Sequence, residues 1–407
     1  MVATRDVQEE QNDHFNEDVN AAPFLEDEDD DDDEGLDAEA EIELGFVSNV
    51  EEEHLSGAYV NWDGGKVGGQ PVWLDPSVNI EVPCECGVNM SFLLQIYCPL
   101  DTPPQAFHRS LYVFCCRTRG CSKIGHARVF RVQLPQKNAF YSEKEDDPTR
   151  KQPEYLKAAK QCAVCGLKGI FACSACNIAQ YCSKVHQKDH WKHGHKQDCP
   201  ASAQQKKLIE SNAEAIRLNG TPFVFPEYSI HIEHEPDRSI AQNESEARMM
   251  QAFEQASLNR TEGNDVFTDD SEIDLSQKDI AKMLGTQAQD KTYVGFLTRV
   301  ALAKDQVLRY SRWDDEEPVL WVHSQDKPTD IPCCSICHGP RRFEFQIMPQ
   351  LLYHLKLSTE LTTLKDQEVD WGTLVVYTCP QSCSAKDKDV DIVEEFVWRQ
   401  SPHDQEV

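Results

Sequence analysis

Eight cysteine and histidine residues recur at short, fixed spacings in the middle of this chain, and this pattern constrains the local fold more than any other feature. Two Cys-x2-Cys pairs are followed by a Cys-x3-His pair and a His-x3-Cys pair, formed by Cys162, Cys165, Cys173, Cys176, Cys182, His186, His195 and Cys199. Eight thiolate and imidazole ligands complete two tetrahedral shells, the coordination that Zn2+ prefers at structural sites. The sequence therefore predicts a module with two structural zinc ions. The alternative is a set of buried thiols or disulfides.

The module is expected to depend on its metal for folding. A segment this short buries little apolar surface, so metal binding and folding should be one event. Closed shells leave no position for a catalytic water, which argues against hydrolysis at these ions. Residues 183–196 are predicted to be a helix that carries two of the histidine ligands. His190 and His193 lie off the ligand pattern and are expected to be solvent-exposed.

The charge of the chain is strongly negative and unevenly distributed. The formal net charge is -30. Residues 1–53 contribute -21 and residues 201–275 contribute -9, so the remainder is electrically balanced. A nucleic-acid-binding face would require clustered lysine and arginine, so direct binding to nucleic acid is not expected. A basic protein is the favoured partner.

The cysteines and the hydropathy pattern indicate a reducing compartment. The first 20 residues are acidic and lack the apolar core of a signal peptide, and no apolar run approaches 18 residues, so no membrane contact is expected. Seventeen cysteines with paired spacings fit metal sites better than a disulfide framework. We therefore expect the protein in the cytoplasm and nucleus.

Composition and motifs divide the chain into five segments and predict an α+β protein. Nine consecutive acidic residues, from Glu26 to Glu34, cannot bury surface, so the tail around them is predicted to be disordered. A helix is expected at 290–303, where apolar residues recur at helical intervals. The segments are a disordered acidic tail (1–43), a β-rich half (44–142), the zinc finger (158–200), an acidic linker (201–280) and a second β-rich half (281–407). The linker is predicted to contain an edge strand near 222–230.

The two β-rich halves repeat one another by position, which predicts a duplicated scaffold. In each half a cysteine is followed at fixed intervals by phenylalanine, glutamine and isoleucine, then by a strand-like run that ends at a cysteine pair. The matched stretches are 86–96 with 337–347, 111–121 with 374–383, and 129–131 with 397–399.

This repeat suggests one further zinc site in each half. The C-terminal candidates are Cys334, Cys337, Cys379 and Cys383, whose spacings suit a zinc ribbon. The N-terminal candidates are Cys84, Cys86, Cys116 and Cys121, where the first pair has the unusual Cys-x-Cys spacing. Buried reduced thiols are the alternative for both clusters. Cys115 and Cys333 are next to candidate ligands in the sequence and could bind zinc in their place. Cys98 is expected to be a thiol of the core.

The finger resembles a MYND-type zinc finger in its order of ligands, in Tyr181 beside Cys182, in Trp191, and in the Gly-His-Lys-Gln stretch at 194–197. With the flanking halves, the chain resembles the programmed cell death protein 2 family. The stretches that carry this wider resemblance are 44–46, 66–69, 92–95, 114–116, 225–228, 346–351 and 395–398.

The resemblance implies an interleaved ligand set in the finger. One zinc would be held by Cys162, Cys165, Cys182 and His186, and the other by Cys173, Cys176, His195 and Cys199. It also implies a function: a non-enzymatic chaperone, or escort, of a basic ribosomal protein of the small subunit in ribosome biogenesis.

Two rival functions start from the same finger. The first is a transcriptional or apoptosis-linked adaptor, in which the finger binds proline-rich peptides beside Tyr181 and Trp191, although these residues also suit the core of the module. The second is an enzyme, because MYND modules also interrupt lysine methyltransferases. No nucleotide-binding loop, nucleophile elbow or metalloprotease helix is present in the sequence, so no enzymatic activity is expected.

Overall fold

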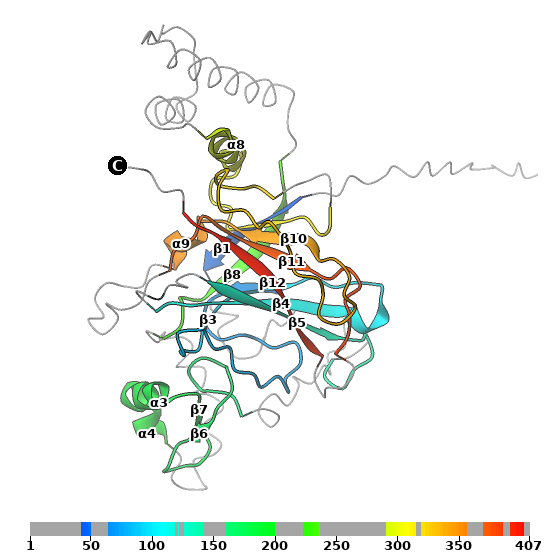
Figure 1. The fold of residues 1–407 in the computed structure, drawn as a ribbon. Coiled ribbons are helices and arrows are strands. Elements are labelled where there is room, and N and C mark those ends of the chain that lie inside the picture. The colour runs from blue at the N-terminus through cyan, green and yellow to red at the C-terminus, as the bar shows by residue number, and fades with distance from the viewer. Residues whose placement is uncertain are drawn as a thin grey trace, which may run out of the picture. The chain divides into compact units, whose positions relative to one another are not determined.

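Ten strands in the described part of the chain close into one antiparallel barrel (Figure 1). The computed structural model describes residues 42–49, 64–118, 121, 126–141, 160–199, 223–236, 290–314, 319–355, 369–385 and 391–402. The strands follow the order β1-β8-β2-β3-β4-β5-β12-β11-β10-β9, and β9 pairs with β1 to close the ring. They are β1 (Glu43–Asn49), β2 (Gly65–Val67), β3 (Ser91–Tyr97), β4 (His108–Cys115), β5 (Ala127–Leu134), β8 (Tyr228–His234), β9 (Leu308–Tyr310), β10 (Arg342–Ile347), β11 (Thr373–Thr378) and β12 (Ile392–Gln400).

Helices are few and short among the described residues. Outside the barrel lie β6 (Phe171–Ala172), β7 (Gln180–Tyr181), α3 (Lys184–His190), η2 (Trp191–His195), α4 (Lys196–Asp198), η1 (Pro104–Ala106), α8 (Lys291–Val300) and α9 (Leu351–His354). The prediction of a β-rich fold is therefore confirmed, and the α+β label is confirmed only in part. The predicted acidic tail, apart from residues 42 and 43, and most of the linker lie outside the described residues. In the part of the chain that the structure places, no helix has the length and hydrophobicity to span a bilayer.

Several strands are buried on both faces, which explains why their sequences read as continuous apolar runs rather than alternating ones. The odd-numbered positions of β4, such as Leu111 and Val113, face a cluster to which strands of both halves contribute, including Leu374 and Val376 of β11. The even-numbered positions, such as Tyr112, face a second cluster with the loop that precedes β3. Burial on both faces requires apolar residues at consecutive positions.

The strand pairs of the two halves share the same irregularity. The pairing of β3 with β4 shifts between Phe92 and Leu94, and the pairing of β10 with β11 shifts between Phe343 and Phe345. A bulge bends a strand and fixes its register. The matched glutamines also act alike: the Oε1 of Gln95 accepts a hydrogen bond from the backbone of residue 72, and the Oε1 of Gln346 accepts one from residue 320, each at 2.8 Å.

The strand predicted in the acidic linker does not lie at a sheet edge. Only residues 228–230 of the predicted segment lie in a strand: they begin β8, which continues to His234 and pairs with β1 on one side and β2 on the other. A pair of glycines accommodates the chain that leads into it: a Cβ on Gly68, at φ +66°, would lie 1.9 Å from the Pro226 carbonyl oxygen. The edge position was wrong because barrel closure gives this strand two partners, which local sequence does not encode.

The predicted helix at 290–303 is observed as α8. Asp290 caps it, because its Oδ1 accepts a hydrogen bond from the Thr292 N–H at 2.8 Å. Phe296 and Val300, which lie on the apolar face of this helix, pack with Val322 and Met348 in a small hydrophobic core.

Candidate metal centres

Four groups of four cysteine or histidine side chains converge in the described part of the chain. Within each group, all ligand atoms lie within 4.8 Å of one another. The groups are Cys84, Cys86, Cys116 and Cys121; Cys162, Cys165, Cys182 and His186; Cys173, Cys176, His195 and Cys199; and Cys334, Cys337, Cys379 and Cys383. Each group contains the same residues that the sequence and the resemblance bring together.

The distances in the two finger groups match the edges of a zinc tetrahedron. With Zn–S of about 2.3 Å and Zn–N of about 2.0 Å, tetrahedral ligands lie about 3.8 Å apart for two sulfurs and about 3.5 Å apart for sulfur and nitrogen. In the first group, Cys165 Sγ lies 3.6 Å from Cys182 Sγ, and Cys162 Sγ lies 3.6 Å from His186 Nδ1. This donor set therefore fits Zn2+.

The second finger group has the same geometry. Cys173 Sγ lies 3.9 Å from Cys199 Sγ, and Cys176 Sγ lies 3.6 Å from His195 Nε2. The predicted helix over this region begins at Lys184, and its helical geometry is interrupted at Gly194. The two groups thus interleave along the chain, as the resemblance implies.

The outer groups have sulfur distances that fit zinc equally well. In the N-terminal group the Sγ of Cys84 lies 3.9 Å from that of Cys121. In the C-terminal group the Sγ of Cys379 lies 3.6 Å from that of Cys337 and 3.9 Å from that of Cys383. All four donors in each group are thiols, a set that closes a structural zinc shell.

Every ligand pair that begins a group is shaped by a backbone turn closed by a hydrogen bond. The residue after the second cysteine has positive φ and donates its N–H to the carbonyl of the first cysteine, at 2.8 to 3.0 Å. This residue is Gly87, Gly166, Asn177 or His338. The turn points both sulfurs at one position. In the Cys-x2-Cys pairs the hydrogen bond spans four positions, and in the Cys-x-Cys pair it spans three, from Gly87 to Cys84. The shorter pair thus forms a tighter turn, and its unusual spacing does not prevent convergence.

The structure separates ligand candidates from their neighbours. Cys115 is fully buried in the barrel core, and burial raises the pKa of its thiol to about 12. Cys333 is exposed and lies outside the C-terminal group. Cys98 is a buried core thiol, as expected.

The helix histidines behave differently from one another. His193 is exposed, as predicted, and its Nδ1 lies 3.0 Å from Asp189 Oδ1. The prediction was wrong for His190, which is buried and lies 2.9 Å from the hydroxyl of buried Tyr181 through Nδ1. Burial lowers the pKa of His190 to about 4, so it is neutral. Trp191, by contrast, is 38% exposed. Of the two aromatic residues proposed for a groove, Tyr181 is core and Trp191 is surface.

The finger is fixed to the loop that precedes β3. Gln70 Nε2 donates to the Ala163 carbonyl at 2.7 Å, and Trp73 Nε1 donates to the Gly166 carbonyl at 3.4 Å. The hydrophobic cluster that contains Tyr112 of β4 and Trp73 also includes the buried ligand Cys165. The first zinc group therefore lies where the finger meets the N-terminal half.

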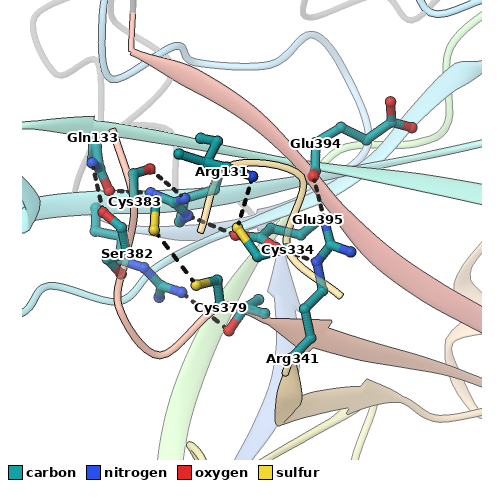
Figure 2. A network of polar contacts seen from close by, with 12 residues as sticks. Arg131, Gln133, Cys334, Arg341, Cys379, Ser382, Cys383, Glu394 and Glu395 are labelled. Carbon is teal, nitrogen blue, oxygen red and sulfur yellow. Dashed lines mark hydrogen bonds and ion pairs between the residues drawn. The ribbon is translucent and has the colours of Figure 1, made fainter. Parts of the chain in front are cut away.

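A polar network that sequence reasoning missed surrounds the C-terminal group (Figure 2). Arg131 Nη2 donates to the Cys383 carbonyl at 2.8 Å, and Arg341 Nη1 donates to the Cys333 carbonyl at 2.8 Å. Both arginines bind Glu395, through Nε atoms at 2.9 and 2.8 Å. One sequence feature could have predicted this network: Arg131 and Glu395 are charged residues within strands that are otherwise rich in apolar residues.

Bound zinc would cross-link each group, and the residues that would hold it are the sixteen side chains of these four groups. Such closed shells supply structural stability and leave no ligand position for a substrate.

Comparison with known families matches almost the whole described barrel and finger. Residues 41–148 match "Programmed cell death protein 2, N-terminal domain", residues 162–199 match "MYND finger", and residues 290–401 match "Programmed cell death protein 2, C-terminal putative domain". A relative from Rattus norvegicus, "Programmed cell death protein 2", is 36% identical over 88% of this chain and 96% of its own length.

This chain belongs to the programmed cell death protein 2 family.

Two further relatives are less similar to this chain. A human protein, "Programmed cell death protein 2-like", is 29% identical over 84% of this chain and 91% of its own length. A Schizosaccharomyces pombe protein, "Probable 20S rRNA accumulation protein 4", is 28% identical over 23% of this chain and 24% of its own length. No solved structure matches. The MYND finger indicates a zinc-binding protein with a role in protein interaction.

Proposed function

We propose that this chain is a non-enzymatic escort of a basic small-subunit ribosomal protein. The observation that carries the proposal is the charge of -30, which resides in residues 1–53 and 201–275, whereas the remainder of the chain is electrically balanced. An acidic binder shields a basic client from RNA and speeds their encounter. The name of the S. pombe relative, which refers to 20S rRNA accumulation, supports a role in ribosome biogenesis.

Four zinc ions are part of this proposal, two in the finger and one in each half. The support is the tetrahedral spacing of the ligand atoms in all four groups, and the positive-φ residue that closes a turn after the second cysteine of each group. We further infer that the β-rich halves arose by duplication. Their equivalent bulges and glutamines, and the placement of one cysteine group in each half, support this inference.

The remaining proposals follow from the same observations. Closed ligand shells favour a protein without enzymatic activity. The reduced thiols and acidic charge favour the cytoplasm and nucleus, with a protein rather than nucleic acid or membrane as partner.

The adaptor function is a second candidate, favoured by apolar side chains on the finger surface. Ile170 is 56% exposed and Trp191 is 38% exposed. Aromatic side chains at a surface are typical anchors for extended proline-rich peptides.

One co-purification experiment tests both functions. Full-length protein, a variant lacking residues 1–40, which leaves β1 and the buried Ile42 in place, and Trp191→Ala are compared for recovery of basic ribosomal proteins at low and high salt. The escort function predicts lower recovery without the tail at low salt, where screening is weak, and normal recovery with Trp191→Ala. Tyr353→Ala removes another exposed aromatic residue, on α9, and is the matched control.

Equal recovery with and without the tail at low salt would contradict electrostatic shielding by the tail. Absence of ribosomal proteins from every sample would contradict the escort function. Loss of bound proline-rich partners from Trp191→Ala alone, at unchanged zinc content, would favour the adaptor.

A further inference from the structure

We propose that the C-terminal cysteine group is a metal-dependent latch for the barrel, holding β12 against β5. This inference rests on the proposed zinc ion at Cys334, Cys337, Cys379 and Cys383. It assigns the metal a role in joining the two halves, and it assigns Arg131, Arg341 and Glu395 as the residues that transmit that role.

The contact between β5 and β12 is one of two seams at which the halves meet. β5 ends the run of N-terminal strands and β12 is the last strand of the chain. Four residue pairs join them, from Ile392 with Val132 to Glu395 with Val129. The adjoining pair of β4 with β5 is joined by eight, and that of β11 with β12 by five. A short pairing between distant parts of the chain needs additional contacts to offset the cost of its closure.

Glu395 supplies those contacts from the buried face of the seam. The side chains of Glu395 and Arg131 are fully buried, and that of Arg341 is 7% exposed. One carboxylate therefore holds two guanidinium groups away from water. Such a group is stable only while its hydrogen bonds are satisfied, because an unpaired buried charge is strongly destabilising.

The remaining donors of the two arginines reach the backbone that carries the metal ligands. Arg341 Nη1 donates to the carbonyls of Pro332 and Cys333, at 2.7 and 2.8 Å, just before the first ligand, Cys334. Arg131 Nη2 donates to the carbonyl of the last ligand, Cys383, at 2.8 Å.

The same ligand loop is also held from β5 by Gln133. Its Nε2 donates to the Ser382 carbonyl at 3.1 Å. Ser382 has φ +40°, a conformation that the loop must maintain between Cys379 and Cys383. Both ligand loops are thus bound from the seam, as Figure 2 shows.

Metal binding and seam closure should therefore stabilise each other. The ion fixes both ligand loops and so fixes the carbonyls that satisfy Arg131 and Arg341. These arginines in turn hold Glu395 and β12. Coupling of this kind is reciprocal: loss of metal weakens the seam, and loss of the seam contacts weakens metal binding.

The adjacent residue provides a matched control. Glu394 pairs with Arg128 at 2.7 Å, but their side chains are 47% and 26% exposed. Arg341 donates a hydrogen bond to the main-chain carbonyl of Glu394 and not to the Glu394 side chain. In Figure 2 the Glu394 side chain points away from this arginine. Substitution of the Glu394 side chain should leave the latch intact.

The test combines zinc counting with hydrogen exchange on the full-length zinc-loaded protein. Cys337→Ser removes an exposed ligand and should lower the zinc count by one. It should also speed exchange of amides at 129–132 and 392–395 by about tenfold or more, with β3 amides unchanged. Glu395→Gln should release that ion to a chelator about 10- to 100-fold faster. Glu394→Gln should match the unsubstituted protein.

The outcomes separate the latch from the zinc site itself. An unchanged zinc count in Cys337→Ser would overturn the C-terminal metal site, and the latch with it. A count lowered by one with unchanged seam exchange would leave the site in place and overturn the latch. Equal effects of Glu394→Gln and Glu395→Gln would also overturn it. If Glu395→Gln fails to fold, the comparison of Cys337→Ser with unsubstituted protein decides.

Discussion

Replacing Cys165 by serine is expected to unfold the finger and to release zinc from it. Cys165 is a buried ligand of the first finger group, and its sulfur lies 3.6 Å from that of Cys182. A structural zinc contributes on the order of 10 kcal/mol to a small domain. Most of that contribution should be lost, because three ligands no longer close the shell. The measurement is zinc content together with proteolysis of residues 160–199.

The same substitution should also weaken the N-terminal half. The cluster that contains Cys165 includes Trp73, which is 3% exposed, and unfolding of the finger would uncover it. Cys98→Ser is the control, because Cys98 is an equally buried thiol outside every ligand group. Its zinc content should be unchanged. Retention of both finger ions and protease resistance in Cys165→Ser would contradict the structural role of this site.

Glu344→Gln is expected to lower the free energy of unfolding by about 3 to 5 kcal/mol, the usual cost of breaking a buried ion pair. Glu344 of β10 and Arg109 of β4 are fully buried and form a double hydrogen bond, at 2.5 and 2.7 Å. This pair links the two halves across the barrel. Without the carboxylate, the guanidinium remains buried with its charge unpaired. Denaturant unfolding measures the effect.

Glu394→Gln is the matched control for this change. The exposed pair of Glu394 with Arg128 should contribute at most about 1 kcal/mol. If both variants lost the same free energy of unfolding, the buried pair of Arg109 and Glu344 would contribute no more to stability than the exposed pair does.

The Glu344 pair also predicts a specific response to acid. Burial alone would raise the pKa of Glu344, but Arg109 lowers it to about 2, from an ordinary value of 4.5. The lowered folded-state pKa means that the contribution to stability is complete above pH 4.5 and is lost as pH falls toward 2. Glu344→Gln should therefore lack this part of the acid sensitivity. An identical decline in both proteins over that range would contradict the assignment.

The ligand groups could be predicted because their spacing is local. Each Cys-x2-Cys pair needs only a tight turn, and a glycine such as Gly166 or a residue such as Asn177 permits it. The matching halves were visible for a similar reason, since Gln95 and Gln346 perform the same backbone contact and so occupy the same relative position.

Barrel closure could not be predicted, because it depends on pairings between distant segments. The prediction that β8 lies at a sheet edge was wrong for this reason. Likewise, the sequence of β5 does not predict that β12 pairs with it. Charged strand residues are ordinarily read as solvent-facing. Arg109, Arg131 and Glu395 are buried because their partners come from the other half of the chain. His190 was misread similarly, since its partner Tyr181 lies on β7.

The most direct test of the metal cross-linked barrel is native mass spectrometry of the full-length protein, followed by hydrogen exchange after complete chelation. The account predicts four zinc ions per chain, one for each ligand group, and loss of protection in the finger and at the seam between β5 and β12 once they are removed. Fewer than four bound ions, or a finger and seam that remain fully protected without metal, would contradict it.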